Sequence, residues 1–415
     1  MEKLRQELRI SVKGLDLGMF VCRLDRPWLE TSFPLQGFTV RTDQELQTLR
    51  RSCNHVYVDI AAGRAPDVRY IEFDDDELVE DARKHDEISD LRKTHWTVQA
   101  DFDEELATAS TVHDVLQRGI EEIMEDLKSG RDLDLRKLRV GVDAMIDSII
   151  RNPSAFNWLR EIKRKDNYTY EHALSCSVWA ASFGRHLGME QEELRELALG
   201  GLLFDLGKMR LPAPLLGKLT KLDADDIRLV RSHVQHGLDI LAGTPDMPAA
   251  IIQMVATHHE RYDGSGYPHG LAGTAIPIGG RILGLIDSYD AMTSRRPYAT
   301  SRSPHQAVTE LYLHRDTLFQ GELVEQFIQT CGIYPTGSLV ELSDGRVGVV
   351  TAVHSLKRLR PSVMVLLDDK LQPLAEFRTL DLGQVRKDEQ GRPLSIRRGL
   401  PPGSHGLDAA TLFLD

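Results

Sequence analysis

A helical pattern that continues from about residue 111 to about residue 330 constrains this fold more than any other feature. Apolar residues recur there at intervals of three and four, the period of a helix with one buried face. Such helices predict an all-α bundle, because each helix must bury its apolar face against another. The pattern covers TVHDVLQRGIEEIMEDL (111–127), LRVGVDAMIDSII (138–150), YTYEHALSCSVWAASFGRHLG (168–188), QEELRELALGGLLFDLG (191–207) and RILGLIDSYDAMTS (281–294).

Shorter patterns precede the helical stretch. LDLGMFVCRLD (15–25), GFTVRT (37–42) and HVYVDI (55–60) are typical of strands, and DQELQTLRRS (43–52) is typical of a helix. A small α+β domain is therefore expected. The charge-rich residues that follow, including FDDDELVED (73–81), indicate a solvated linker or an exposed helix.

The pattern changes again after about residue 332. GSLVELSDGRVGVVTAV (337–353) predicts a hairpin that turns at Ser-Asp-Gly, and SVMVLLDD (362–369) predicts a further strand. The expected fold is thus multidomain, an all-α bundle between a small α+β domain and a β-rich extension. The expected domains are an N-terminal α+β regulatory domain with an acidic linker (1–110), a helical domain (111–331) and a β-rich C-terminal extension (332–415).

The composition is typical of a globular chain, since 41% of the 415 residues are hydrophobic and 27% are charged. The formal net charge of −12 argues against a nucleic-acid polymer as partner, because such a surface needs clustered lysine and arginine. No apolar run reaches the roughly 18 residues of a membrane span, and MEKLRQELRI lacks the apolar stretch of a signal peptide. We expect a cytoplasmic protein with reduced cysteines, because its four cysteines show no paired spacing.

Histidines and carboxylates recur on apolar helix faces of the helical region. One such histidine is more often a hydrogen-bonded core residue than a ligand, and His186, His236 and His314 are interpreted in that way. HHERYDGSGYP (258–268) differs, because it places two adjacent histidines and a glutamate before a glycine-rich turn. Taken together, the polar residues of four separate helical segments are better explained by a shared metal centre. The candidates are His172, Asp205, His233, His258, His259 and Asp287.

The same region contains several stretches of one known pattern. These are YTYEHALSCSV, LLFDLGKMRLP, HVQHGLDIL, HHERYDGSGYPHGLAGTAIP, RILGLIDSYDAMTSRRPYA and LVEQFI. From about residue 150 to about residue 330 the chain resembles an HD-GYP domain, the helical branch of the HD phosphohydrolases that degrades cyclic di-GMP. The first 130 or so residues resemble an uncharacterised domain that is often fused in front of this module.

The resemblance implies a role for each matching residue. Two divalent metal ions, iron or manganese, would be bound, with Asp205 bridging them. The ligands of the first metal would include His172 and Asp287, and those of the second would be His233, His258 and His259. Lys208 would act in catalysis near the substrate phosphate. Asp290 and Arg296 would lie near the bound cyclic di-GMP, and the pocket would be walled by the GYP loop, Gly266, Tyr267 and Pro268.

One departure from the family pattern bears on activity. The family's His-Asp pair is Phe204-Asp205 here, and a phenyl ring offers no lone pair to a metal. Ala299 and Thr300 replace the basic residues that usually follow Arg-Pro-Tyr, and the later Phe-Asp-Pro is Phe319-Gln320-Gly321. The missing histidine predicts a weakened first metal site, and the missing basic residues predict weaker phosphate binding.

Three hypotheses remain open on the sequence. The first is a metal-dependent phosphodiesterase that converts cyclic di-GMP to pGpG and further to GMP, with impaired first-metal affinity. The second is an inactive module that senses cyclic di-GMP, or that regulates a diguanylate cyclase (GGDEF) partner through the GYP loop. The third is a generic HD nucleotide hydrolase, which the GYP loop and Arg-Pro-Tyr disfavour. A homodimer is a further open alternative.

Overall fold

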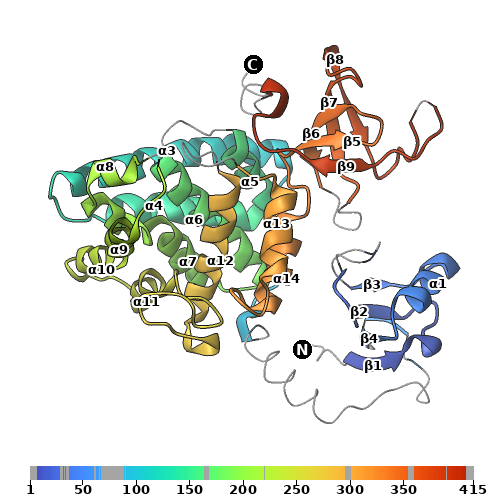
Figure 1. Ribbon diagram of the computed structural model, residues 1–415, viewed down its shortest axis with the longest axis horizontal. Coiled ribbons are helices and arrows are strands. Elements are labelled where there is room, and N and C mark those ends of the chain that lie inside the picture. The colour runs from blue at the N-terminus through green and yellow to red at the C-terminus, as the bar shows by residue number, and fades with distance from the viewer. Residues whose placement is uncertain are drawn as a thin grey trace. The chain divides into compact units, whose positions relative to one another are not determined.

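The computed structural model divides the chain into two compact units near residue 90, which are described separately (Figure 1). The first unit takes residues 1–90 with 356–359, and the second takes 91–355 and 360–415. The residues described are 7–28, 31, 33, 37–59, 62–64, 66, 88, 90–162, 168–218, 220–294, 301–353, 359–388 and 390–407.

The first unit is an antiparallel sheet of order β1-β4-β2-β3 with one helix. The strands are β1 (Glu7–Ser11), β2 (Phe20–Leu24), β3 (Phe38–Thr39) and β4 (His55–Asp59), and η1 (Val12–Gly14) follows β1. The helix α1 (Asp43–Ser52) begins at a capping box. The Thr42 side chain accepts a hydrogen bond from the Glu45 backbone N–H, and the Glu45 carboxylate accepts one from the Thr42 backbone N–H. The expected α+β character is confirmed, and β1 is an additional strand.

The helical part of the second unit is a bundle around α6, α7 and α12, which pack against one another (Figure 1). Four aromatic residues meet edge to face in its core, Trp179, Phe183, Tyr289 and Phe327. The elements are α3 (Phe102–Lys128), α4 (Arg136–Arg151), α5 (Pro153–Ile162), α6 (Tyr168–Leu187), α7 (Gln191–Leu203), η4 (Leu206–Arg210), α8 (Ala213–Leu216), α9 (Ala224–Arg231), α10 (His233–Ala242), α11 (Ala249–Thr257), η5 (Gly273–Ala275), α12 (Ile278–Thr293), α13 (Pro304–Leu313) and α14 (Gly321–Cys331).

The helical bundle begins earlier than residue 111. Asp101 caps α3, which starts at Phe102, so the end of the expected linker is helical. The charge-rich sequence does not predict the start of this helix, because one of its carboxylates occupies a buried position where an apolar residue would be expected. Glu105 is 2% exposed and forms an ion pair with Arg151 at 2.7 Å. The acidic run 73–81 lies outside the described residues.

A five-stranded antiparallel sheet of order β8-β7-β6-β5-β9 follows the bundle. Its elements are β5 (Leu339–Leu342), β6 (Val347–Ala352), β7 (Ser362–Leu367), β8 (Pro373–Asp381), β9 (Ile396–Gly399) and the short η6 (Ser404–Gly406). The hairpin between β5 and β6 turns at Gly345, whose φ of +91° suits glycine. The predicted hairpin and β-rich character are therefore confirmed.

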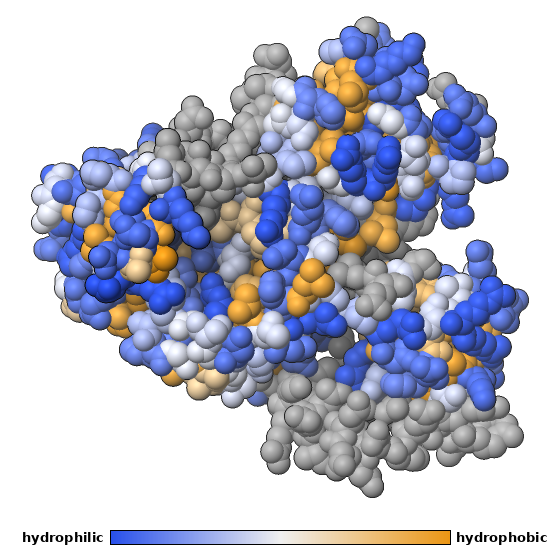
Figure 2. Space-filling view, viewed as in Figure 1, coloured by the Kyte–Doolittle hydropathy of each residue, from blue (hydrophilic) through white to orange (hydrophobic). Residues whose placement is uncertain are grey.

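Hydrophilic residues dominate the face of the molecule drawn in Figure 2. An apolar area lies over α8 and α9, where Leu216, Ile227 and Leu229 are partly exposed. Among the described residues, no helix combines the length and the apolar character needed to cross a membrane. The apolar helix faces are mostly buried, as the periodicity predicts.

Candidate metal centre

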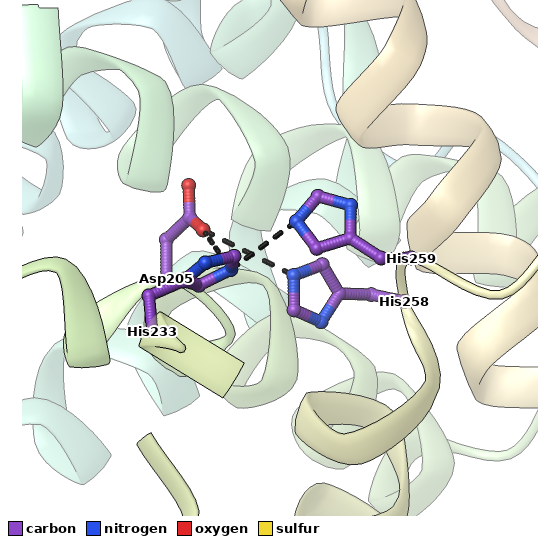
Figure 3. Close-up of side chains that lie close together, drawn as sticks. All are labelled: Asp205, His233, His258 and His259. Carbon is purple, nitrogen blue, oxygen red and sulfur yellow. Dashed lines mark hydrogen bonds and ion pairs between the residues drawn. The ribbon is translucent and has the colours of Figure 1, made fainter. Parts of the chain in front are cut away.

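Four of the predicted ligands converge on one point (Figure 3). Asp205 lies just beyond the end of α7, His233 begins α10, and His258 and His259 follow the end of α11. One donor atom from each lies within 4.8 Å of all the others. The Nε2 atom of His233 is 3.3 Å from Asp205 Oδ1 and 3.2 Å from His259 Nε2. Three imidazoles and one carboxylate are a suitable donor set for a divalent transition metal.

A second group shares Asp205 with the first. His172 on α6 and Asp287 on α12 form this group with Asp205, and His172 approaches the other oxygen of the Asp205 carboxylate. The Nε2 atom of His172 lies 3.1 Å from Asp287 Oδ1 and 3.6 Å from Asp205 Oδ2. Asp205 is thus placed between two groups of donors, as a bridging ligand would be, and all six predicted ligands lie at one centre.

Backbone carbonyls orient two of the imidazoles. The Nδ1 atoms of His233 and His258 lie 2.6 Å from Val230 O and 2.9 Å from Val255 O. Each Nδ1–H therefore donates to its carbonyl, so the Nε2 lone pair is directed at Asp205. Each carbonyl lies three residues before its histidine, in the last turn of α9 or α11, so the local backbone fixes the tautomer of each imidazole.

The buried polar atoms of this centre fit a bound cation. Asp205 Oδ1 and His258 Nε2 are buried and have no hydrogen-bond partner among the described residues. The lone pair of His233 Nε2 faces the same carboxylate oxygen. Unpaired buried acceptors that face one another are unfavourable, and a cation between them removes this cost. The residues present therefore fit a divalent metal ion.

The protonation states also suit metal binding. Burial lowers the pKa of His258 to about 4 and, together with His258, holds the pKa of His259 well below its usual value. Burial alone would raise the pKa of Asp205, but its charged neighbours, Lys208 first, bring that pKa below its ordinary value. The imidazoles are therefore neutral and the carboxylate is ionised near pH 7, as metal ligands must be.

We expect metal-free protein to lose stability as the pH falls from about 6.5 toward 4. In that range the unfolded chain protonates His258, whereas the folded chain keeps it neutral. The free energy of unfolding is therefore unaffected by His258 above the pKa that this residue has in the unfolded chain. On acidification below that pKa it falls, by roughly 3 kcal/mol for this one group. Urea unfolding of chelator-treated protein across this range measures the slope. His258→Leu should flatten it, and a wild-type stability that does not fall would contradict this assignment.

Asp290 lies behind His172, and its predicted position near the dinucleotide stays a prediction. Its carboxylate is 0% exposed, and Oδ2 lies 2.7 Å from His172 Nδ1. The hydroxyls of Ser175 and Ser294 also donate to it. A carboxylate enclosed by these donors orients the His172 ring, so that Nε2 faces Asp205 and Asp287. Asp290 is therefore placed to position the His172 ring.

Replacing Asp290 with asparagine should weaken metal binding at the His172 group by roughly 10-fold to 100-fold. The amide removes the charge that stabilises the His172 Nδ1–H donor, while it keeps the size of the side chain. Manganese titration followed by electron paramagnetic resonance measures this affinity. Ser294→Ala, which removes one supporting hydroxyl, should have a smaller effect. Unchanged manganese affinity in Asp290→Asn would exclude this positioning role.

Phe204 fills the space between the two groups of ligands. It is 0% exposed, and its ring makes edge contacts with His172 and His258 at centroid distances of 5.7 and 4.9 Å. An apolar ring thus stands next to ligands of both groups, where it offers no donor atom.

The GYP loop lies against the metal centre. The Tyr267 ring stacks on His259, with centroids 4.6 Å apart and planes 25° apart. Gly266 has no room for a side chain, because a Cβ atom there would lie 2.4 Å from Arg261 N and Glu260 Cα. Close packing therefore requires glycine at position 266. Gly264 differs, because its φ of +81° is the left-handed conformation that favours glycine.

Glu260 anchors this loop instead of binding metal. Its carboxylate is 5% exposed and accepts from the backbone N–H groups of His269 at 2.7 Å and Leu271 at 3.0 Å. The third potential ligand of HHE is thus occupied by the loop that follows it. The sequence offered a signal for this role, because an acceptor just before a glycine-rich turn is often used within that turn.

The structure describes some of the remaining predicted residues and not others. Lys208 follows Asp205 in η4 and forms an ion pair with its Oδ2 atom. Pro268 is exposed beyond Tyr267. Arg296, Ala299 and Thr300 lie outside the described residues, so their predicted roles stay predictions. His186, interpreted as an ordinary histidine, lies 3.0 Å from the amide oxygen of Gln326.

Family models match three parts of this chain. An HD domain model matches residues 158–323, a domain of unknown function (DUF3391) matches 7–138, and a KOW domain associated with HD domain matches 339–387. Cyclic di-GMP phosphodiesterase PA4108 of Pseudomonas aeruginosa is 31% identical over 92% of this chain and 90% of its own length.

Two further relatives match over shorter parts. The cyclic di-GMP phosphodiesterase response regulator RpfG of Xanthomonas campestris is 35% identical, over 43% of this chain and 50% of that protein. The 3'3'-cGAMP-specific phosphodiesterase 2 of Vibrio cholerae is 28% identical, over 52% of this chain and 43% of that protein.

Proposed function

Because this chain belongs to the HD-GYP family of phosphodiesterases, we propose that it hydrolyses cyclic di-GMP with the help of bound divalent metal. The product would be pGpG, with further cleavage to GMP. The observation that carries the proposal is the convergence of Asp205, His233, His258 and His259. Two of their buried ligand atoms, Asp205 Oδ1 and His258 Nε2, have no hydrogen-bond partner among the described residues. A buried cluster of this kind has no evident structural purpose without a cation.

The residues of this chain would bind and orient the reactants. Two divalent ions, iron or manganese, would supply an acidified water and neutralise charge on the phosphate when bound. Lys208, a quarter of whose side chain is exposed, adds a positive charge beside Asp205 for the substrate phosphate. The stacked Tyr267 ring closes one wall of the pocket and keeps the His259 imidazole in place.

Phe204 is the reason to propose a weakened first metal site. The His233 group retains four donor residues, whereas the His172 group has three, one of which is the shared Asp205. Three protein ligands can still hold a metal, as open catalytic sites do. Slow hydrolysis is therefore proposed, and an inactive module that only senses cyclic di-GMP is the second candidate that Phe204 favours.

The finer parts of the proposal concern location and partners. We propose a cytoplasmic location. None of the described helices could span a membrane. A diguanylate cyclase is proposed as a partner at the GYP loop, because Pro268, His269 and Gly270 are exposed there. A homodimer is proposed as a further arrangement.

Incubation of the purified protein with cyclic di-GMP and excess manganese or iron(II) tests this function. Chromatography should show pGpG accumulating slowly, and a chelator or His258→Ala should stop it. Parallel reactions with 3'3'-cGAMP determine the substrate preference. If neither metal supports turnover while cyclic di-GMP still binds, the sensor hypothesis replaces the enzyme.

A further inference from the structure

Arg231 lies at the rim of the metal centre, where no role has been assigned to it so far. Its guanidinium carbon is 4.6 Å from the centroid of the Tyr267 ring. Tyr267 also stacks on His259 with the same centroid separation. Both groups fit on this ring when they take opposite faces of it. Arg231 is therefore separated from a candidate metal ligand by a single aromatic layer.

The backbone explains this position. Arg231 ends α9 and His233 begins α10, so one junction carries both the rim cation and a ligand (Figure 1). The GYP loop reaches the same junction, because its Tyr267 ring contacts Arg231. The Tyr267 N–H also donates to the His259 carbonyl at 3.3 Å. The packing of two segments far apart in sequence thus creates the stack.

The charge of Arg231 has no acidic partner among the residues that the structure describes. It is exposed, and within the described part of the chain its side chain contacts the Tyr267 ring. Arg228, on the same helix, instead pairs with Asp225 at 2.9 Å. An aromatic contact leaves the N–H donors of a guanidinium available and limits its movement. Arg231 is therefore an exposed cation that can bind an anion beside the metal centre.

We propose that Arg231 binds the second phosphate of the cyclic dinucleotide, the one that is not being cleaved. This inference rests on the proposed function. A cyclic dinucleotide carries two phosphates on opposite sides of its ring, so only one can lie at the metal centre. Lys208 is held by Asp205 inside the centre, whereas Arg231 lies outside the Tyr267 wall. Arginine suits this task because its forked donors match two phosphate oxygens.

Two substrates separate this role from a structural one. Cyclic di-GMP has two phosphates, whereas bis(p-nitrophenyl) phosphate has one, which must lie at the metal. Arg231→Gln should lower the ratio of kcat/KM for cyclic di-GMP to that for bis(p-nitrophenyl) phosphate about tenfold, through KM. Arg231→Lys should lose less of this selectivity. Arg228→Gln is the matched control and should keep the wild-type ratio.

Equal losses on both substrates would overturn the proposal, because Arg231 would then act through Tyr267 and His259. An unchanged ratio in Arg231→Gln would overturn it as well. If the wild-type protein hydrolyses neither substrate, the enzymatic function fails separately. The Kd of cyclic di-GMP, compared with the Kd of inorganic phosphate, then tests Arg231. A loss confined to cyclic di-GMP supports its role, and equal or absent losses reject it.

Discussion

Asp205→Asn should lower the rate of cyclic di-GMP hydrolysis by a factor on the order of 10³, the largest loss expected from one substitution. This carboxylate is the only residue that belongs to both groups of ligands, with Oδ1 facing the histidines of one group and Oδ2 facing His172. The amide keeps the size of the side chain but removes the negative charge that a bridging ligand needs. Both metals should therefore bind more weakly, and the reaction loses charge stabilisation from both.

Two measurements separate this effect from misfolding. Metal content should fall in Asp205→Asn, while circular dichroism should still show a helical protein. Asp225→Asn on α9 is the control, because that aspartate is also ion-paired but is largely exposed. A mutant that keeps both its metal and its rate would show that Asp205 does not bridge metal ions.

Phe204→His should increase the rate, on the order of 10-fold to 100-fold, and raise the bound metal from about one to about two ions per chain. The phenyl ring lies between His172 and His258, so an imidazole at this position can direct a lone pair at the His172 group. The substitution removes buried apolar volume, and the metal-free variant should be less stable for that reason.

Phe204→Leu is the matched control, since it also loses aromatic volume but supplies no donor. It should match the wild type in metal content and should not gain activity. If Phe204→His and wild type are equally inert while cyclic di-GMP still binds, the site is not limited by the missing imidazole. The chain would then be a sensor of the dinucleotide.

The sequence predicted which polar residues converge better than it predicted their surroundings, and the positions of these residues explain why. His233, His258 and Asp205 lie at helix ends, where turn residues and apolar periodicity mark the boundaries. Asp205 was expected within a helix through 207, but α7 ends at Leu203 and the turn that follows brings the carboxylate to the centre. Family resemblance then connected segments that periodicity alone could not join.

The supporting residues could not be predicted because their partners are distant in sequence. Asp290 shares a helix face with Asp287, and the sequence cannot tell which carboxylate faces the cavity and which faces His172. The Arg231 contact likewise depends on how the GYP loop returns over α9. The start of α3 was missed for another reason, because Glu105 appears as a surface charge until Arg151 pairs with it.

Anomalous scattering from crystals of manganese-loaded wild-type protein tests the central claim most directly. The account predicts a strong anomalous peak enclosed by Asp205, His233, His258 and His259, with a weaker peak beside His172 and Asp287. Phe204→His should strengthen the second peak. Well-ordered crystals with no peak among these side chains, or with manganese bound only elsewhere, would contradict the account.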